Sequence, residues 1–118
     1  MQNSNRAKVK YKVHLIIDAE EDLFEIYKYV YLSDSEDKAD LLYSKLKEVC
    51  NSLENYAERG HVVGELSEIG ITGFQELHFK PYRIIYQIIE DTVYIHCILD
   101  GRRDMQRLLQ ERLIRSNK

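Results

Sequence analysis

The chain of 118 residues contains no tryptophan, one proline and only two cysteines. Cys50 falls in a helical pattern and Cys97 in a strand pattern, so the two form neither a disulfide framework nor a pair at metal-ligand spacing. We therefore expect both to be small buried hydrophobic residues. No cluster of Asp, Glu or His has metal-ligand spacing either. We expect neither a metal nor a cofactor.

Long apolar runs are also missing. No stretch reaches the roughly 18 to 20 apolar residues that cross a bilayer, and the start of the chain lacks the apolar segment of a secretion signal. We expect a cytoplasmic protein without membrane contact. With 44% apolar residues, the length suffices for one core. Residues 1–118 are therefore expected to form a single domain, with a flexible N-terminus over residues 1–7.

The chain has no broad basic field. Its formal net charge is −3, and residues 18–58 carry twelve acidic and four basic side chains, whereas the two ends are basic. Proteins that grip nucleic acid mainly through phosphates need a wide positive surface for most of their sequence-independent affinity. This chain can offer only a local basic patch.

A strand and a helix are predicted at the N-terminal side. Apolar and polar residues largely alternate over residues 9–17, which is a strand pattern. Asp18 then stands where a helix N-cap belongs, with Glu21 as its capping-box partner, and apolar residues recur at helical spacing. These signals predict a helix over about residues 19–31.

A second helix is predicted to follow after a short connection. Ser33 and Glu36 repeat the capping signature, and an apolar stripe that runs from Ala39 to Tyr56 predicts a helix ending near residue 57. Two helices joined by so few residues should pack as an antiparallel hairpin.

The second half reads as a loop, three strands and a short helix. Residues 58–73 contain four glycines and little sustained period, which indicates a loop with room for one short helical turn. Strand patterns follow at Phe74–Phe79, Tyr82–Ile89 and Thr92–Leu99, separated by turns at Lys80-Pro81 and Glu90-Asp91.

Asp104 can cap a last helix that carries Met105, Leu108, Leu109 and Leu113 on one side. The expected class is α+β, in the order β-α-α-β-β-β-α. The helical hairpin should lie on one face of a four-stranded, mainly antiparallel sheet.

This order and two segments carry a family resemblance. The segment Pro81-Tyr82-Arg83-Ile84-Ile85-Tyr86, followed by Leu99-Asp100-Gly101-Arg102-Arg103-Asp104, resembles the RelE/ParE superfamily of toxins from bacterial type II toxin-antitoxin modules. The opening of the first helix, from Asp18 to Val30, is similar as well. The resemblance implies a small toxin, associated with plasmid stabilization and growth inhibition, that a cognate antitoxin neutralises. It does not fix the target, because a fold does not fix a function.

Two kinds of activity occur among such toxins. Members that resemble RelE are ribosome-dependent mRNA endoribonucleases, and members that resemble ParE inhibit DNA gyrase. The RelE pattern has an arginine early in one strand and another after the last strand, matched here by Arg83 and by Arg103 or its neighbour Arg102. The lysines of the preceding strand are not matched, because Glu76 and His78 stand there. The chain is therefore closer to ParE-like members.

A nuclease site remains open as an alternative. Attack of a 2'-hydroxyl on RNA needs a proton acceptor, a proton donor and cations that stabilise the phosphorane. Glu76, His78 and His96 can supply acid-base groups near neutral pH beside Arg83 and Arg103. Whether these side chains share a face depends on strand register, which the sequence leaves open.

Structural explanations exist for the same residues. Arg83 can pair with Glu76 across neighbouring strands, and Arg102 and Arg103 can pair with Asp100 and Asp104 at a solvated strand end. The tyrosines Tyr82, Tyr86 and Tyr94 fit core and rim positions better than base-stacking platforms.

The preferred hypothesis is a toxin that binds a target such as DNA gyrase. Its alternatives are the endoribonuclease, which would act on the ribosome and mRNA, and a module that binds its antitoxin without toxicity. Whether the chain is an enzyme, and whether it is a monomer, stays open. The candidates for target binding are Arg83, Tyr86, Arg102 and Arg103. The candidates for antitoxin binding are Leu23, Tyr27, Val30, Leu42 and Leu46.

Overall fold

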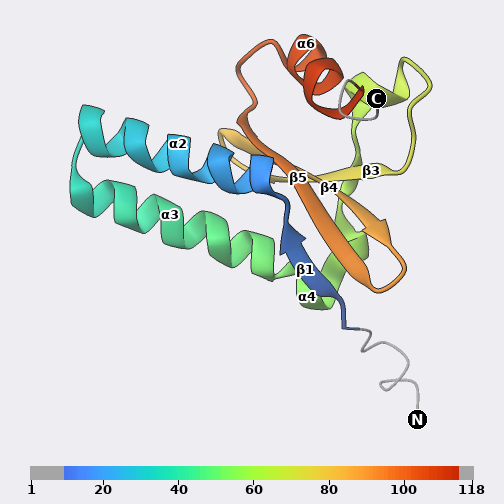
Figure 1. Cartoon of the computed structure of the whole chain (residues 1–118), viewed down its shortest axis with the longest axis horizontal. Helices are drawn as coiled ribbons and strands as arrows, with labels where there is room; N and C mark the ends of the chain where they lie inside the picture. Colours follow the sequence, from blue (N-terminus) through green and yellow to red (C-terminus); the bar gives the residue numbers. More distant parts are fainter. Residues whose placement is uncertain (1–9, 115–118) are drawn as a thin grey trace.

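The computed structural model describes residues 10–114 of the chain (Figure 1). Its elements follow in the order β1 (Lys12–Leu15), α2 (Ile17–Ser33), α3 (Glu36–Asn51), α4 (Leu53–Tyr56), the 3-10 turn η1 (Ala57–Arg59), β2 (His61–Val62), α5 (Gly64–Ser67), β3 (Phe74–Phe79), β4 (Tyr82–Ile89), β5 (Thr92–Asp100), α6 (Met105–Leu109) and the π-helical turn η2 (Gln110–Ile114). The flexible N-terminus expected at residues 1–7 lies outside the described residues.

The α+β class is confirmed, but the sheet has five strands instead of four. Its strand order is β1-β5-β4-β3-β2, with β1 parallel to β5 and the other pairs antiparallel. The three predicted strands and their turn at Glu90-Asp91 are present. The extra strand, β2, has only two residues and adds to the free edge of β3. The first strand is shorter than predicted, because Ile17 already belongs to α2.

Both faces of the sheet are covered. Ile84 pairs with Ile98 and belongs to the core under α2 and α3, whereas the next pair, Ile85 with Cys97, belongs to a second core under α5 and α6. Neighbouring residues of a strand point to opposite faces, so the two cores lie on opposite sides. The register shifts where Tyr86 pairs with Ile95, which leaves the residue between, His96, as a bulge.

The predicted helical hairpin is present, and Figure 1 shows it extending well beyond the sheet. Two predicted helix starts were wrong. Ile16 precedes α2, so Asp18 lies in the first turn and does not cap it, and there its charge suits the helix dipole. The cap of α3 is Ser35, whose hydroxyl accepts from the Lys38 amide, while the Ser33 hydroxyl donates to the Tyr29 carbonyl.

An ion pair completes the edge of β5 beyond the end of β1. The Ile16 amide donates to the Ile95 carbonyl, and then the chain turns into α2. From α2, Asp22 accepts a hydrogen bond from the Ile98 amide at 3.0 Å, while Arg112 of η2 donates to the His96 carbonyl at 3.2 Å. Two bonds of 3.0 and 2.9 Å join Asp22 to Arg112. Side chains thus satisfy backbone groups that a longer strand would have paired.

The last helix agrees with its prediction. Asp104 caps α6 by accepting from the Arg107 amide at 3.2 Å. The four apolar residues predicted on one side, Met105, Leu108, Leu109 and Leu113, are all buried in the second core. No helix of the described part of the chain is long and apolar enough to cross a membrane.

We predict that Gly60→Ala destabilises the fold. A Cβ at this position would fall on the Tyr86 hydroxyl, which donates to the Ala57 carbonyl at 2.6 Å, and 2.9 Å from the Glu76 carbonyl oxygen. The free energy of unfolding, measured by urea denaturation, should fall by about 1 to 3 kcal/mol.

Gly64→Ala is the matched control, because nothing lies within 4 Å of a Cβ there. It should leave stability unchanged or raise it by about 0.5 to 1 kcal/mol. Equal stability of both variants would contradict this description of the Gly60 contact.

Candidate functional site

Arg83 is held between two carboxylates on the face of the sheet that α5 covers. Its guanidinium donates to both oxygens of Glu65, from Nη1 at 2.8 Å and from Nη2 at 2.7 Å, and its Nε donates to Glu76 at 2.7 Å. The side chain of Arg83 is only 15% exposed. We call Arg83, Glu65 and Glu76 the Arg83 clamp.

The clamp confirms the cross-strand pairing of Arg83 with Glu76 and adds a partner from α5. The hydrogen bonds from Arg83 hold the pKa of Glu65 below its ordinary value, and the bonds with Glu65 and Glu76 raise the pKa of Arg83. Both shifts favour the charged forms of Glu65 and Arg83. The two carboxylates outweigh the single guanidinium, so the clamp is not a cationic site.

His78 lies at the exposed side of the clamp. Its Nε2 is 3.4 Å from a Glu76 oxygen, and its side chain is 48% exposed. The ring of His61 on β2 lies 6.3 Å from that of His78. Three of the nuclease candidates, Glu76, His78 and Arg83, are thus brought together.

His96 is not part of that group. It occupies the bulge of β5, its ring packs edge-on against Phe74 at 5.4 Å, and its Nε2 is buried without a hydrogen-bond partner among the described residues. Burial lowers the pKa of His96, as does the charge of Arg112. His96 is half-buried, and its ring is engaged in packing.

Arg102 and Arg103 follow β5 and behave differently. Arg102 pairs with Asp100, through bonds of 2.9 and 2.6 Å from its guanidinium, which confirms the predicted strand-end pair. These bonds lower the pKa of Asp100 to about 2. Arg103 is exposed, and its guanidinium has no hydrogen bond or ion pair with any residue between 10 and 114.

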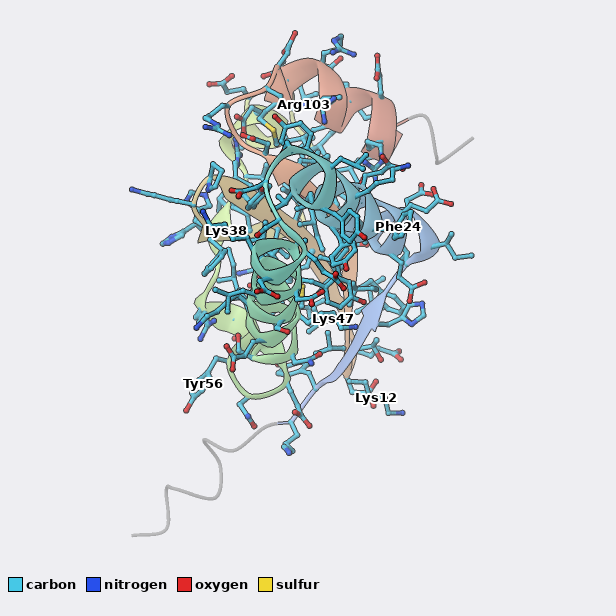
Figure 2. All side chains as sticks on the ribbon, turned by 90° about the vertical axis from the view of Figure 1, so that its left-hand side faces the viewer. Lys12, Phe24, Lys38, Lys47, Tyr56 and Arg103 are labelled. Carbon is cyan, nitrogen blue, oxygen red and sulfur yellow. The ribbon has the colours of Figure 1, made fainter. Side chains whose placement is uncertain are left out.

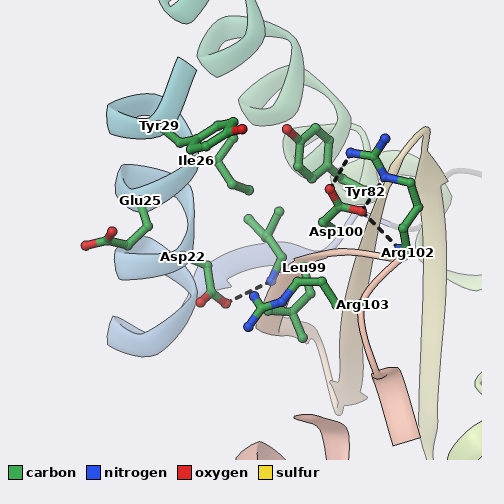
Figure 3. Close-up of a pocket in the computed structure, with 10 residues that line it drawn as sticks. Asp22, Glu25, Ile26, Tyr29, Tyr82, Leu99, Asp100, Arg102 and Arg103 are labelled. Carbon is green, nitrogen blue, oxygen red and sulfur yellow. Dashed lines mark hydrogen bonds and ion pairs between the residues drawn. The ribbon is translucent and has the colours of Figure 1, made fainter. Parts of the chain in front are cut away.

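Arg103 lines a groove of about 300 Å3 between α2 and the end of β5 (Figure 3). We call it the Arg103 groove. Its lining residues are Asp22, Glu25, Ile26, Tyr29, Tyr82, Ile98, Leu99, Asp100, Arg102 and Arg103. Because Tyr82 pairs with Asp100 and Arg83 pairs with Leu99, the groove and the clamp lie on opposite faces of the sheet. The two arginines of the nuclease pattern therefore do not converge.

Several binding candidates are buried. Tyr86 is fully buried and its hydroxyl is occupied by Ala57, so it offers no surface to a target. Leu23 and Leu46 belong to the core under the hairpin, so they cannot contact an antitoxin either. Val30 and Leu42 are half-buried. The helical spacing places these apolar residues of α2 and α3 on one stripe of each helix. It does not show which of them face the sheet and which stay accessible to a partner.

Aromatic side chains gather on one exposed surface of the hairpin. Tyr27 donates to Asp40 at 3.0 Å, and its ring lies 6.0 Å from those of Tyr31 and Tyr43. The hairpin patch consists of Phe24, Tyr27, Tyr31, Asp40, Tyr43 and Ser44. Figure 2 shows Phe24 beside the hairpin and Arg103 at the end of the molecule that carries α6. The patch and the Arg103 groove flank different sides of α2.

Sequence reasoning missed Glu65, Asp22, Arg112 and Tyr29. The first three act through partners far away in the chain, for which no local pattern gives a signal. Tyr29 is 71% exposed. The only sequence signal for this exposure is its position outside the apolar stripe of α2. No group of three or more metal-binding side chains converges in the part of the chain that the structure describes.

Comparison with known proteins now decides the family. Residues 17–105 match the model of the ParE toxin of the type II toxin-antitoxin system parDE. The chain belongs to this family. No curated protein sequence matches it.

Solved structures agree on the fold. The chromosomal ParDE toxin-antitoxin system from P. aeruginosa matches with a TM-score of 0.64 and 18% identity, over 75% of this chain and 94% of that chain. The toxin-antitoxin complex RelBE2 from Mycobacterium tuberculosis matches with a TM-score of 0.57 and 18% identity, over 78% of this chain and 92% of that chain. By its family match, the chain is a RelE/ParE superfamily toxin, the toxin component of a type II toxin-antitoxin system.

We predict that Glu65→Gln destabilises this toxin in a pH-dependent way. The clamp lowers the pKa of Glu65 from 4.5, so its contribution is fully present above pH 4.5 and is lost as the pH falls through the lowered value. At pH 7 the variant should unfold with about 1 to 3 kcal/mol less free energy than wild type. The difference between the two should shrink as the pH falls through the lowered pKa of Glu65.

Glu68→Gln is the control for this measurement, since Glu68 is exposed and follows α5 directly. Its stability should equal that of wild type at both pH values. If the free energy of unfolding of Glu65→Gln stayed below that of wild type by a constant amount down to pH 3, the carboxylate charge of Glu65 would not be what stabilises the clamp.

Proposed function

We propose that this ParE-family toxin acts by binding a protein target such as DNA gyrase, and not by cutting mRNA. The observation that carries the proposal is the Arg83 clamp. RNA cleavage needs a cation free to stabilise the phosphorane, but both carboxylates of the clamp bind the guanidinium of Arg83.

The arrangement of the other candidates supports the same reading. Arg103 lines a groove on the opposite face of the sheet from Arg83, and the half-buried His96 packs its ring against Phe74. An RNA phosphate at the clamp would also meet Glu65 and Glu76, which repel it. Binding a protein needs no such assembly, only an exposed surface with a few strong contacts. Arg103, with Arg102 beside it, is the exposed cationic candidate that remains for the target.

The endoribonuclease is the second candidate, and one contact favours it. The Nε2 of His78 lies 3.4 Å from a Glu76 oxygen, and the His78 side chain is open to solvent, so a substrate can reach this pair. A ribosome that supplied the missing cations could use that pair. The test below therefore measures RNA cleavage as well.

We further propose that the cognate antitoxin lies along α2, over the hairpin patch and the half-buried Val30 and Leu42. Exposed apolar side chains that gather on one surface mark a binding site for a partner helix or strand. Here Phe24 is 55% and Tyr43 is 40% exposed. Tyr27 is the sequence candidate that the structure leaves at the centre of the patch.

The class of activity can be measured with the purified toxin. We predict that it inhibits supercoiling by DNA gyrase and leaves mRNA intact in a ribosome-dependent cleavage assay. Arg103→Ala should weaken the inhibition about 10-fold, because loss of a central arginine contact typically costs at least 1.4 kcal/mol of binding.

Arg107→Ala is the matched control, since Arg107 pairs with Asp104 and Glu111 on the surface of α6. It should inhibit as wild type does. Cleaved mRNA ends that required the ribosome, together with unchanged supercoiling, would establish the nuclease instead.

A further inference from the structure

The Arg103 groove carries one unpaired charge. Asp22 is bound by Arg112, Asp100 by Arg102, and Glu25 lies 3.4 Å from Lys28. Each acidic group that lines the groove thus has a cationic partner. The Arg103 guanidinium forms no hydrogen bond or ion pair with a residue between 10 and 114, although its charge helps to lower the pKa of Asp100. The free charge of the groove is therefore a guanidinium.

An apolar wall lines another part of the groove, on the side of Arg102 and away from the Arg103 guanidinium. Tyr29 of α2 is 71% exposed, and Figure 3 shows it extending toward Tyr82 of β4 above Ile26, with Arg103 farther along the groove. Leu32, the next turn of α2, is 76% exposed and lengthens the apolar ridge. A tyrosine that leaves most of its ring in solvent gains by packing against a partner.

The chemistry of a ligand follows from these two features. A carboxylate can form two parallel hydrogen bonds with a guanidinium, and an apolar side chain fits between the tyrosines over Ile26. A polyanion such as nucleic acid fits less well, because Asp22, Glu25 and Asp100 would face its phosphates. A volume of about 300 Å3 is at the lower end for ligand pockets, which suits one or two side chains of a docked segment.

We infer that the Arg103 groove anchors the cognate antitoxin, through an acidic residue on Arg103 and an apolar residue between Tyr29 and Tyr82. This inference rests on the proposed pairing of toxin and antitoxin. The groove borders α2 on the side opposite the hairpin patch, so a segment that crosses α2 reaches both surfaces. Since Arg103 is also the candidate contact for the target, an antitoxin in the groove excludes the target. Neutralisation is then direct competition for one arginine.

The test is a calorimetric titration of the purified cognate antitoxin into the full-length toxin. Arg103→Glu should weaken binding at least 50-fold, and Tyr29→Ala about 10-fold. Arg107→Glu and Tyr56→Ala are matched controls, because Tyr56 is 61% exposed on α4 and Arg107 lies on α6, and both should bind as wild type does. Unchanged thermal unfolding of Arg103→Glu and Tyr29→Ala would show that the groove variants remain folded.

A charge exchange identifies the contact directly. Each acidic residue of the antitoxin is changed to lysine in turn, and one of these variants should restore binding to Arg103→Glu while it weakens binding to the wild-type toxin. Full affinity of Arg103→Glu and Tyr29→Ala, with weakened Phe24→Ala and Tyr43→Ala, would overturn the inference and leave the toxin-antitoxin pairing intact. If the wild-type toxin bound no antitoxin, the pairing itself would fail.

Discussion

The hydrogen bonds of Arg83 join segments that are far apart in the chain. Its guanidinium binds Glu65 of α5 and Glu76 of β3, and its side chain runs against Gly101, where a Cβ would come within 2.7 Å of Arg83 Cδ. The arginine therefore fixes α5 on the sheet and requires a glycine after β5. Removing both carboxylates would leave the largely buried guanidinium of Arg83 without compensation, which is costly. This constraint makes Arg83 a structural residue, although its position in the RelE pattern belongs to catalysis.

A second ion pair has a comparable role on another edge. Asp22 and Arg112 bind each other and the two backbone groups of β5 that β1 does not reach, so they tie α2 and the C-terminal turn to the central sheet. Arg102 is occupied by Asp100. The arginines around the end of β5 are thus bound to acidic residues within the chain, except for Arg103. That exception is why a surface that is acidic in composition can still present a cation to a partner.

The sequence predicted those elements whose apolar period is long, namely the helical hairpin and the three consecutive strands. It failed where local signals compete: Ser33 and Ser35 are both plausible caps, and a two-residue strand such as β2 has no period to detect. It also could not give the register, and the bulge at His96 decides which side chains share a face. The site was therefore predicted in part. Arg83 and Glu76 were paired correctly, but Glu65 contacts Arg83 only through the tertiary fold.

The central claim is that Arg83 serves the fold and Arg103 serves binding. The most direct measurement is growth inhibition by the triple variant Arg83→Met, Glu65→Gln, Glu76→Gln, which removes the clamp without leaving an unpaired charge. At equal levels of folded protein, we predict that this variant inhibits growth as strongly as wild type does. Arg103→Ala should inhibit growth more weakly than wild type. Loss of inhibition in the folded triple variant, with full inhibition by Arg103→Ala, would contradict the account.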